Sequence, residues 1–307
     1  MPFLAKLPKG STVAMEACGG AHHLACQCTE LGLVPRIISP QFVSALRMSQ
    51  KNDSNDADAI AEAAKRPGMR FVAVKTQQQL ELQMLHRTRE RYIKNRTALI
   101  NQMRGFLTEI GIILPQGVSA FRKGIKRLLE TREDSGVFPK LIQTLWSELL
   151  TIDKLAEDLT KEIQRIAGSH PICKQLQNLK AIGPLTASAM VSIVGNPKEY
   201  KNGRNFAASL GLVPRQNSTG GKTRLGSITK CGDGYLRKLL VHGARSVVYH
   251  SVRQSKSDPL SLWIRQLYER RGANHAAVAL ANKTARCLWG VMAGKHPQTP
   301  LTHTADA

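Results

Sequence analysis

Short apolar stretches alternate with helix-like stretches over the first quarter of the chain. Residues 11–16 (STVAME) are small and β-prone, and they predict a strand that ends at Glu16. Strands are also predicted at 33–38 (LVPRII) and 70–74 (RFVAV). Helices are predicted between the strands, the last of them starting near Asp53 in a polar, cap-rich segment. This strand–helix–strand–helix–strand order is typical of an α/β domain.

The pattern then changes to a seven-residue repeat of apolar positions, which predicts two long helices, the first from Gln77 to about Gly111. The first repeat consists of Leu85, Tyr92, Leu99 and Phe106, with Met103 and Ile110 on the neighbouring row. The second consists of Leu145, Ile152, Leu159 and Ile166, backed by Leu149 and Ile163. An ordinary helical core is one interpretation. Two matching repeats favour a helical hairpin or coiled coil, with a connecting segment between 115–117 and 136–139.

His170-Pro171 marks the start of a second domain that is predicted to be mostly α-helical. Its expected helices are 174–181, 185–194, 203–210, 233–250, 258–271 and 275–292. The predicted organisation is therefore an α/β domain, a helical or coiled-coil linker, a helical domain and a frayed tail, at 1–76, 77–170, 171–294 and 295–307.

Charge gives the first indication of function. The chain has 44 Lys and Arg against 22 Asp and Glu, a net charge of +22, which predicts a polyanionic partner, DNA or RNA. Between 87 and 104 there is one acid, Glu90. The cations in that span are Arg87, Arg89, Arg91, Lys94, Arg96 and Arg104. No apolar stretch is long enough for a membrane span and no signal peptide is recognisable, so we expect a cytoplasmic protein. The six cysteines have no zinc-ribbon spacing.

Three carboxylates form the first candidate site. Glu16 lies at a predicted strand end, and Asp53 and Asp56 are three residues apart, so that on a helix they share a face. Carboxylates that converge from separate elements can bind magnesium, which can assist phosphodiester transfer. The alternative is that the aspartates only cap a helix, and the spacing alone favours that interpretation.

A glycine-proline turn and a basic loop form the second and third candidates. Gly183 begins a helix whose free amides can seat a DNA phosphate, although most such turns have no ligand. In the loop 210–238, the hydroxyl of Ser218 or Thr219 could attack phosphorus, with Lys222 and Arg224 stabilising charge. The alternative is a loop that only binds phosphate. Across 201–250 one acid, Asp233, faces nine cations: Lys201, Arg204, Arg215, Lys222, Arg224, Lys230, Arg237, Lys238 and Arg245.

These pieces, in this order, resemble one family over nearly the whole chain. The resembling words are VAMEACGGAHH (13–23), SQKNDSNDADAIAEAAKRP (49–67), RTALINQMRG (96–105), AIGPLTASA (181–189), FAASLGLVPRQNSTGGKTRLGSITK (206–230) and LRKLLVHGARSV (236–247). The family is that of insertion-sequence transposases with an amino-terminal RuvC-like DEDD domain and a carboxy-terminal domain that holds a nucleophilic serine. Some members are known as bridge-RNA-guided recombinases. The resemblance implies an α/β RuvC/RNase H-like first domain and a DNA transposase or recombinase activity.

The family's functional residues transfer by position. Its glutamate matches Glu16 and its paired aspartates match Asp53 and Asp56, which together would hold magnesium. Its serine matches Ser218, although an alignment shift would exchange Ser218 with Thr219. That serine would form a covalent phosphoserine link to DNA before strand exchange. We expect DNA or RNA contacts at Arg87, Arg91, Lys94, Arg96, Arg104, Gly183, Arg215, Lys222, Arg224, Lys230, Arg237 and Lys238.

The resemblance also implies partners. The acidic domain of one subunit would complete the serine site of another, so a homo-oligomer, from dimer to tetramer, is expected. A structured guide RNA would pair with target and donor DNA.

The sequence departs from the family at its start. The family's first aspartate precedes the glutamate by some forty residues, whereas the fifteen residues before Glu16 contain no acid. The first domain is therefore expected to be incomplete, with an unpaired sheet edge, through an upstream start codon or decay of the copy. Two other functions compete with an active transposase: an inactive nucleic-acid-binding remnant and a RuvC-like nuclease.

Overall fold

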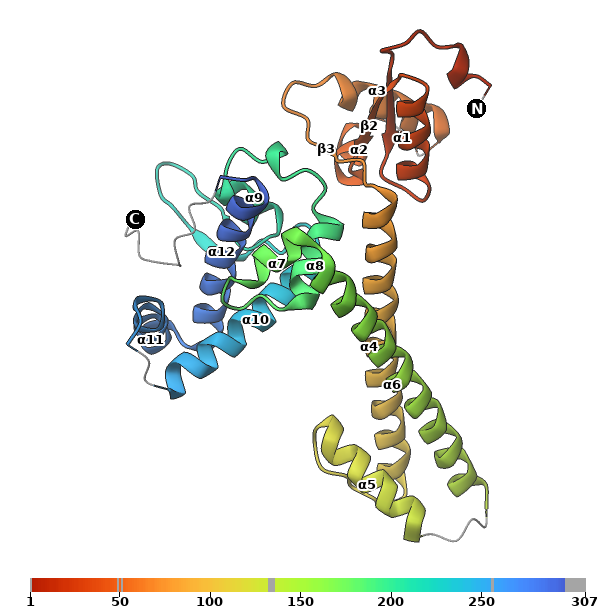
Figure 1. The fold of residues 1–307 in the computed structure, drawn as a ribbon, viewed down its shortest axis with the longest axis vertical. Coiled ribbons are helices and arrows are strands. Elements are labelled where there is room, and N and C mark those ends of the chain that lie inside the picture. The colour runs from red at the N-terminus through yellow and green to blue at the C-terminus, as the bar shows by residue number, and fades with distance from the viewer. Residues whose placement is uncertain (1, 49, 51, 132–135, 255–256, 296–307) are drawn as a thin grey trace. The chain divides into compact units, whose positions relative to one another are not determined.

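The computed structural model describes residues 2–48, 50, 52–131, 136–254 and 257–295. The chain forms two compact units (Figure 1). The first comprises Met1–Leu80 together with Ser192–Glu199, and the second comprises Glu81–Val191 together with Tyr200–Ala307.

A three-stranded sheet forms the centre of the first unit. Strand β1 (Thr12–Glu16) pairs in parallel with β2 (Val34–Ile38), which pairs antiparallel with the short β3 (Phe71–Val72). Glu16 lies opposite the last residue of β2, so the carboxyl ends of β1 and β2 coincide. Within the described residues, β1 has a strand neighbour on one side only and is an edge strand.

Side chains alternate across this sheet, and each face is covered by helices. On β1, Met15 packs into one cluster and Ala14 into the other, because successive strand residues point to opposite faces. Helix α1 (Ala21–Glu30) contributes to the first cluster, and α2 (Pro40–Leu46) and α3 (Asp53–Lys65) contribute to the second. The predicted α/β order is confirmed, with strand ends within two residues of those expected.

Residues 192–199 belong to the first unit, although the sequence placed them in the second domain. A side chain at Gly195 would lie 2.4 Å from Ala73 Cβ, so glycine allows this segment to pack directly beside the end of β3. A 3-10 turn, η2 (Pro197–Glu199), follows. Nothing in the local helical pattern of 185–194 indicates such a long-range contact.

Three helices, rather than two, form the arm of the second unit. Helix α4 (Gln77–Glu109) and α6 (Val137–Ser169) are the two long helices, and α5 (Val118–Thr131) lies at one end of the pair (Figure 1). Their common core contains Leu99, Ile100, Met103, Leu107, Phe121, Ile125, Ile142, Leu149 and Ile152. The segment that was expected to be a plain connection therefore contains α5, which supplies Phe121 and Ile125, two of the largest buried side chains of this core. The GVFP segment (136–139) was expected to belong to that connection, but it lies at the start of α6.

The predicted heptad positions are buried in part. Leu99 and Met103 are buried on α4, and Leu149, Ile152 and Ile163 are buried on α6. The expectation for Ile110 is wrong: this residue follows the end of α4 and is 44 % exposed. The chain turns there, at Gly111 with φ +76°, so the repeat does not continue along a helix.

Partly buried charged groups connect the arm helices. Asp153 of α6 pairs with Arg96 of α4 at 3.6 Å and with Arg122 of α5. Arg104 donates to the carbonyls of Leu114, at 2.9 Å, and of the residues at 115 and 117. Its guanidinium also lies 5.0 Å from the centre of the Phe121 ring. Arg96 and Arg104 therefore hold the arm helices together. Fewer of their N–H donors are available to bind a nucleic acid.

The remainder of the second unit is a helical domain with one β-hairpin. Its helices are α7 (Pro171–Gln177), α8 (Pro184–Ile193), α9 (Gly203–Ser209), α10 (Gly234–Arg253), α11 (Pro259–Arg271) and α12 (Ala273–Met292). Six helices were expected here, and the first was misplaced. The residues after α7 form a turn in which Ala181 has φ +73°, so the predicted end at 181 is wrong. The hairpin of β4 (Pro214–Gln216) and β5 (Leu225–Ile228) was not predicted.

None of the described helices is long and apolar enough to cross a membrane. The tail from 296 onward, expected to be frayed, lies outside the described residues.

We predict that Gly243→Ala destabilises the second unit. A Cβ at Gly243 of α10 would lie 2.1 Å from the carbonyl oxygen of Ala181, a backbone atom that cannot move alone. Overpacking of this kind costs about 1–3 kcal/mol. Urea unfolding followed by circular dichroism measures the change.

The matched control is Gly105→Ala on α4, where an added Cβ meets nothing within 4 Å. Replacement of an exposed helical glycine by alanine should stabilise the protein by about 0.5–1 kcal/mol. Equal effects of the two variants would show that the approach of α10 to the Ala181 turn is not close in solution.

Candidate serine site and nucleic-acid interface

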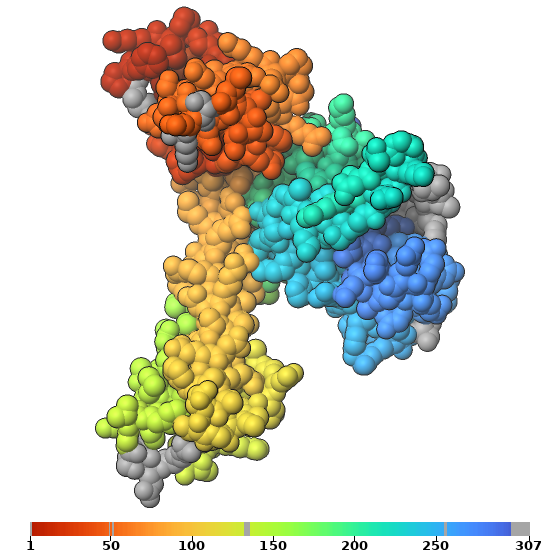
Figure 2. Space-filling view, turned by 180° about the vertical axis from the view of Figure 1, so that it is seen from behind, coloured from red at the N-terminus to blue at the C-terminus, as the bar shows by residue number. Residues whose placement is uncertain are grey.

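The β4–β5 hairpin holds the candidate nucleophile. The Asn217 N–H donates to the Arg224 carbonyl at 3.0 Å, and the Lys222 N–H donates to the Thr219 carbonyl at 3.0 Å. Gly220 and Gly221 form the two-residue turn with φ +55° and +74°. Positive φ at both positions is the requirement of a type I′ turn, which glycine meets without strain. In the space-filling view the hairpin segment, coloured turquoise, lies at the surface of its unit (Figure 2).

Ser218 is exposed beside this turn, and its hydroxyl oxygen accepts two hydrogen bonds. The Gln216 side-chain amide donates at 2.9 Å and the Arg224 backbone N–H donates at 3.4 Å. Donors aimed at an oxygen stabilise negative charge that develops on it. Among the described residues, no carboxylate or imidazole is hydrogen-bonded to Ser218, so the proton acceptor that a nucleophile needs must come from elsewhere.

Thr219, the alternative nucleophile, is exposed next to Ser218 but has different surroundings. Its backbone forms the bridge to Lys222 that closes the turn. In the hydrogen bonds of the described chain, the Thr219 hydroxyl has no N–H donor comparable to those of Ser218. The geometry therefore distinguishes the two hydroxyls.

The hairpin is strongly positive. No acid occurs between Glu199 and Asp233. The exposed cations of the hairpin and its flank are Arg215, Lys222, Arg224 and Lys230. Exposed cations without acidic neighbours are suited to phosphate groups.

Arg237 of α10 holds the base of the hairpin. Its guanidinium donates to the carbonyls of Leu210 at 3.0 Å and Cys231 at 2.9 Å. Between these carbonyls the backbone approaches closely: a Cβ at Gly211 would lie 2.4 Å from the Cys231 oxygen. Asn282 of α12 also donates to the Leu212 carbonyl at 3.0 Å. Arg237, expected to bind nucleic acid, therefore has a structural use in this unit.

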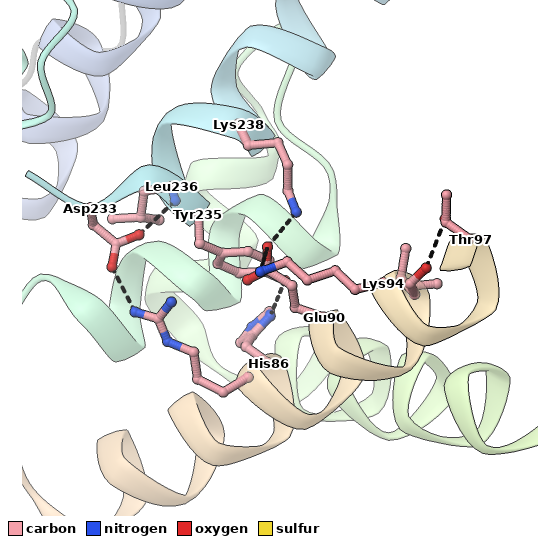
Figure 3. Close-up of polar contacts among 10 residues, drawn as sticks. His86, Glu90, Lys94, Thr97, Asp233, Tyr235, Leu236 and Lys238 are labelled. Carbon is pink, nitrogen blue, oxygen red and sulfur yellow. Dashed lines mark hydrogen bonds and ion pairs between the residues drawn. The ribbon is translucent and has the colours of Figure 1, made fainter. Parts of the chain in front are cut away.

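Ion pairs join the start of α10 to α4 (Figure 3). Asp233 caps α10 by accepting from the Leu236 N–H at 2.9 Å, and it also pairs with Arg87 at 2.8 Å. Lys238, one turn later, pairs with Glu90 at 2.6 Å. Two of the cations expected to meet nucleic acid, Arg87 and Lys238, thus neutralise acids of the protein itself.

A buried histidine lies between these pairs (Figure 3). His86 of α4 is fully buried, with Nδ1 2.9 Å from the Tyr235 hydroxyl and Nε2 3.0 Å from the Ser188 hydroxyl. Ser188 donates its own proton to the carbonyl of residue 184 at 2.7 Å. Ser188 then accepts from His86 Nε2–H, and in the neutral ring that the lowered pKa of His86 favours, Tyr235 donates to Nδ1. Burial, and then the neighbouring Arg89 and Arg87, lower the pKa of His86 to about 4.

The three predicted metal ligands lie in the first unit and are not gathered. Glu16 ends β1, and Asp53 and Asp56 lie in the first turn of α3, capped by Asn52. Asp53 is exposed, whereas Asp56 is paired with Arg47 at 3.1 Å. Among the described residues, no three His, Cys, Asp or Glu side chains could together hold a metal ion. The described chain alone does not gather these carboxylates, and their role as magnesium ligands stays a prediction.

The turn at Gly183 is exposed and precedes α8. The Gly183 carbonyl accepts from the Thr186 and Ala187 N–H groups, which begins the helix. Lys180, in the same turn, pairs with Asp258, the N-cap of α11, at 2.9 Å. The Ser261 hydroxyl and then Lys180 lower the pKa of Asp258 to about 2. The turn is thus fixed to the domain, while the expected phosphate contact stays a prediction.

Arg91 and Lys94, the other two cations expected to bind nucleic acid, lie on α4. Arg91 is exposed, with its guanidinium 5.2 Å from the centre of the Tyr92 ring. Lys94 is exposed and only 3.8 Å from Glu90, a weak surface pair. Both side chains are exposed and accessible to a phosphate.

Sequence reasoning missed Gln216, the side chain that donates to Ser218. It also missed the hairpin that aligns the two residues. The signal was present: Gly-Gly between two polar, β-compatible stretches predicts a type I′ hairpin.

We predict that His86 makes stability depend on pH. A folded-state pKa of about 4, against 6.5 ordinarily, means that the unfolded chain binds a proton first as pH falls. Stability should therefore fall between pH 6.5 and 4, by about 3 kcal/mol from this group. Denaturant unfolding at several pH values measures it against His86→Gln, whose amide retains a donor and an acceptor. Parallel pH profiles of the two proteins would contradict a neutral buried His86.

Two family profiles of known proteins match this chain. Residues 173–258 match the profile of the family described as Transposase IS116/IS110/IS902 family. Residues 3–112 match a second transposase profile, designated DEDD_Tnp_IS110. The two profiles cover the hairpin and the acidic region respectively.

Whole-chain relatives agree with the profiles. A probable family 20 transposase of Pseudomonas aeruginosa is 44% identical over 293 residues, covering 94% of this chain and 86% of the relative. The transposase for insertion sequence element IS1111A of Coxiella burnetii is 42% identical over 287 residues, 92% of this chain and 78% of the relative. The transposase for insertion sequence element IS1328 of Yersinia enterocolitica is 40% identical over 292 residues, 94% and 85%. This chain belongs to the IS116/IS110/IS902 family of insertion-sequence transposases.

Proposed function

We propose that this transposase cuts and rejoins DNA through Ser218, which becomes covalently linked to a DNA phosphate. One observation carries the proposal: an exposed hydroxyl, with two N–H donors on its oxygen, lies on a turn among exposed cations and no acids. Such a surface attracts a phosphodiester and presents it with one oriented oxygen.

The proposed step balances as a transesterification. Ser218 Oγ attacks phosphorus and forms a P–O bond, while one P–O bond to a deoxyribose oxygen breaks. The serine proton passes to an acceptor outside the hairpin, and the leaving oxygen takes up a proton to become a hydroxyl. Because the number of phosphoester bonds is unchanged, the link can be reversed by a hydroxyl of another strand, which is strand exchange. Lys222 and Arg224 would stabilise charge on the phosphoryl oxygens.

The acidic residues are proposed to serve a second role. The DEDD profile over 3–112 supports use of a divalent cation by this family, and magnesium is the expected one. Glu16, Asp53 and Asp56 would be its ligands, completed by groups from DNA or from another subunit. Because the described chain does not gather them, we assign no step to the cation. The same proposal includes assembly of the chain into a homo-oligomer and binding of a structured guide RNA.

We predict that Ser218→Ala abolishes a protein–DNA adduct. The probe is a nicked duplex carrying the element end, incubated with the element's flanking RNA and magnesium, and adducts are resolved on denaturing gels. Since alanine has no nucleophilic oxygen, the slow-migrating adduct should disappear. Ser227→Ala, an exposed serine on β5 of the same hairpin, is the matched control and should retain it.

Other outcomes select the competing functions. An adduct that survives Ser218→Ala but not Thr219→Ala assigns the neighbouring hydroxyl. Binding without any adduct favours an inactive remnant, and cleavage without an adduct favours a nuclease of the RuvC type.

We further predict that replacing an exposed arginine changes the salt dependence of DNA binding, whereas replacing an arginine bonded within the protein does not. Arg224→Gln should reduce the slope of log K against log salt for element-end duplex by about 1, because one phosphate contact is lost. Arg104→Gln should leave that slope unchanged and lower the melting temperature, since its guanidinium bonds backbone carbonyls. Fluorescence anisotropy over a salt series measures the slope, and the reverse result would place DNA on the arm instead of the hairpin.

A further inference from the structure

One side of α10 presents cations and an aromatic ring to solvent. His242, Arg245, Tyr249 and Arg253 are all exposed and follow one another at intervals of three or four residues. This spacing places them on one side of the helix, over about 17 Å. We call these four residues the α10 outer face. No acid occurs in α10.

The packing of α10 explains why this side of the helix is exposed to solvent. The opposite side of α10 carries its buried residues, among them Leu240, Ala244 and Val248, and α10 packs against α11 and α12. Arg245 is held at the surface by its bond to the Asn274 amide oxygen of α12, at 3.0 Å. The side chains of the outer face therefore contribute little to the core of the unit.

Tyr249 is the unusual member of the face. It is 51 % exposed even though the Arg253 guanidinium lies 4.2 Å from the centre of its ring. The neighbouring His250 ring stands edge-on to it at 5.6 Å, with an interplanar angle of 87°. An arginine over one face keeps the ring orientation and adds positive charge, while more than half of the residue stays accessible.

We propose that the α10 outer face binds an unpaired segment of nucleic acid, with a base stacked on Tyr249 and phosphates on Arg245 and Arg253. This inference rests on the proposed function as a nucleic-acid enzyme. Aromatic rings with flanking cations are the means by which single strands are bound without sequence preference. In a duplex the base faces are already stacked, so a duplex would use the cations and not the ring.

The arrangement gives the face a role distinct from the hairpin. Strand exchange separates paired strands, and unpaired nucleotides must be held while they lack a partner. Ser218 is on the β4–β5 turn, whereas Tyr249 is near the end of α10, so binding at the outer face requires no chemistry at the serine.

The experiment uses the full chain carrying Ser218→Ala, so that binding is measured without covalent capture. Labelled 12-nucleotide oligo-dT and oligo-U, and a 12-base-pair duplex, are titrated by fluorescence anisotropy. Adding Tyr249→Ala should weaken single-strand binding about tenfold, the equivalent of ~1.4 kcal/mol for one stacked base. Duplex binding should change less than twofold. The ratio of the dT and U affinities shows whether DNA or RNA is the preferred strand.

Two further variants keep the result interpretable. Tyr249→Phe retains the ring and should bind single strands like the parent. Tyr268→Ala, which removes a 38 % exposed tyrosine from α11, should do the same. Unchanged single-strand binding in Tyr249→Ala, or an equal loss for duplex, overturns the proposal, and neither outcome depends on whether Ser218 is the nucleophile.

Discussion

A neutral imidazole enclosed by three helices fixes the geometry from which the candidate site is built. His86 of α4 bonds Tyr235 of α10 and Ser188 of α8, and its environment disfavours the charged ring. The first turn of α10 is thereby located, with Asp233 and Arg87 beside it. One turn later Arg237 reaches the two carbonyls at the hairpin base. A buried polar network of this kind specifies one arrangement because any other would leave buried polar groups without a partner.

Much of the fold could be predicted, because strand alternation and helical spacing are local. The three strands of the first unit and the two long arm helices follow from such patterns. Helix α5 could not be predicted this way: its buried Phe121 and Ile125 face helices far away in sequence. The attachment of 192–199 to the first unit depends on one close approach, Gly195 to Ala73, which no local pattern encodes.

The candidate site, like the fold, could be predicted only in part from the sequence. Residue type and loop composition indicated Ser218 or Thr219 as candidate hydroxyls among cations, and the family resemblance selected Ser218. Whether a cation meets solvent or a carbonyl depends on the tertiary structure, and Arg104 and Arg237 prove to be fastened within the protein. The carboxylates illustrate the opposite problem: Glu16, Asp53 and Asp56 have a suitable order in the sequence, but in the described chain Asp56 is paired with Arg47 and the three form no metal-holding group.

In the proposed function, the hairpin turn presents the Ser218 hydroxyl oxygen as the atom that captures DNA. Mass spectrometry of the trapped adduct, after nuclease and protease digestion, tests it most directly. We expect a nucleotide remnant on the peptide around the Gly220-Gly221 turn, with fragment ions that place it on Ser218. A remnant on any other residue, Thr219 included, would show that Ser218 is not the atom that captures DNA.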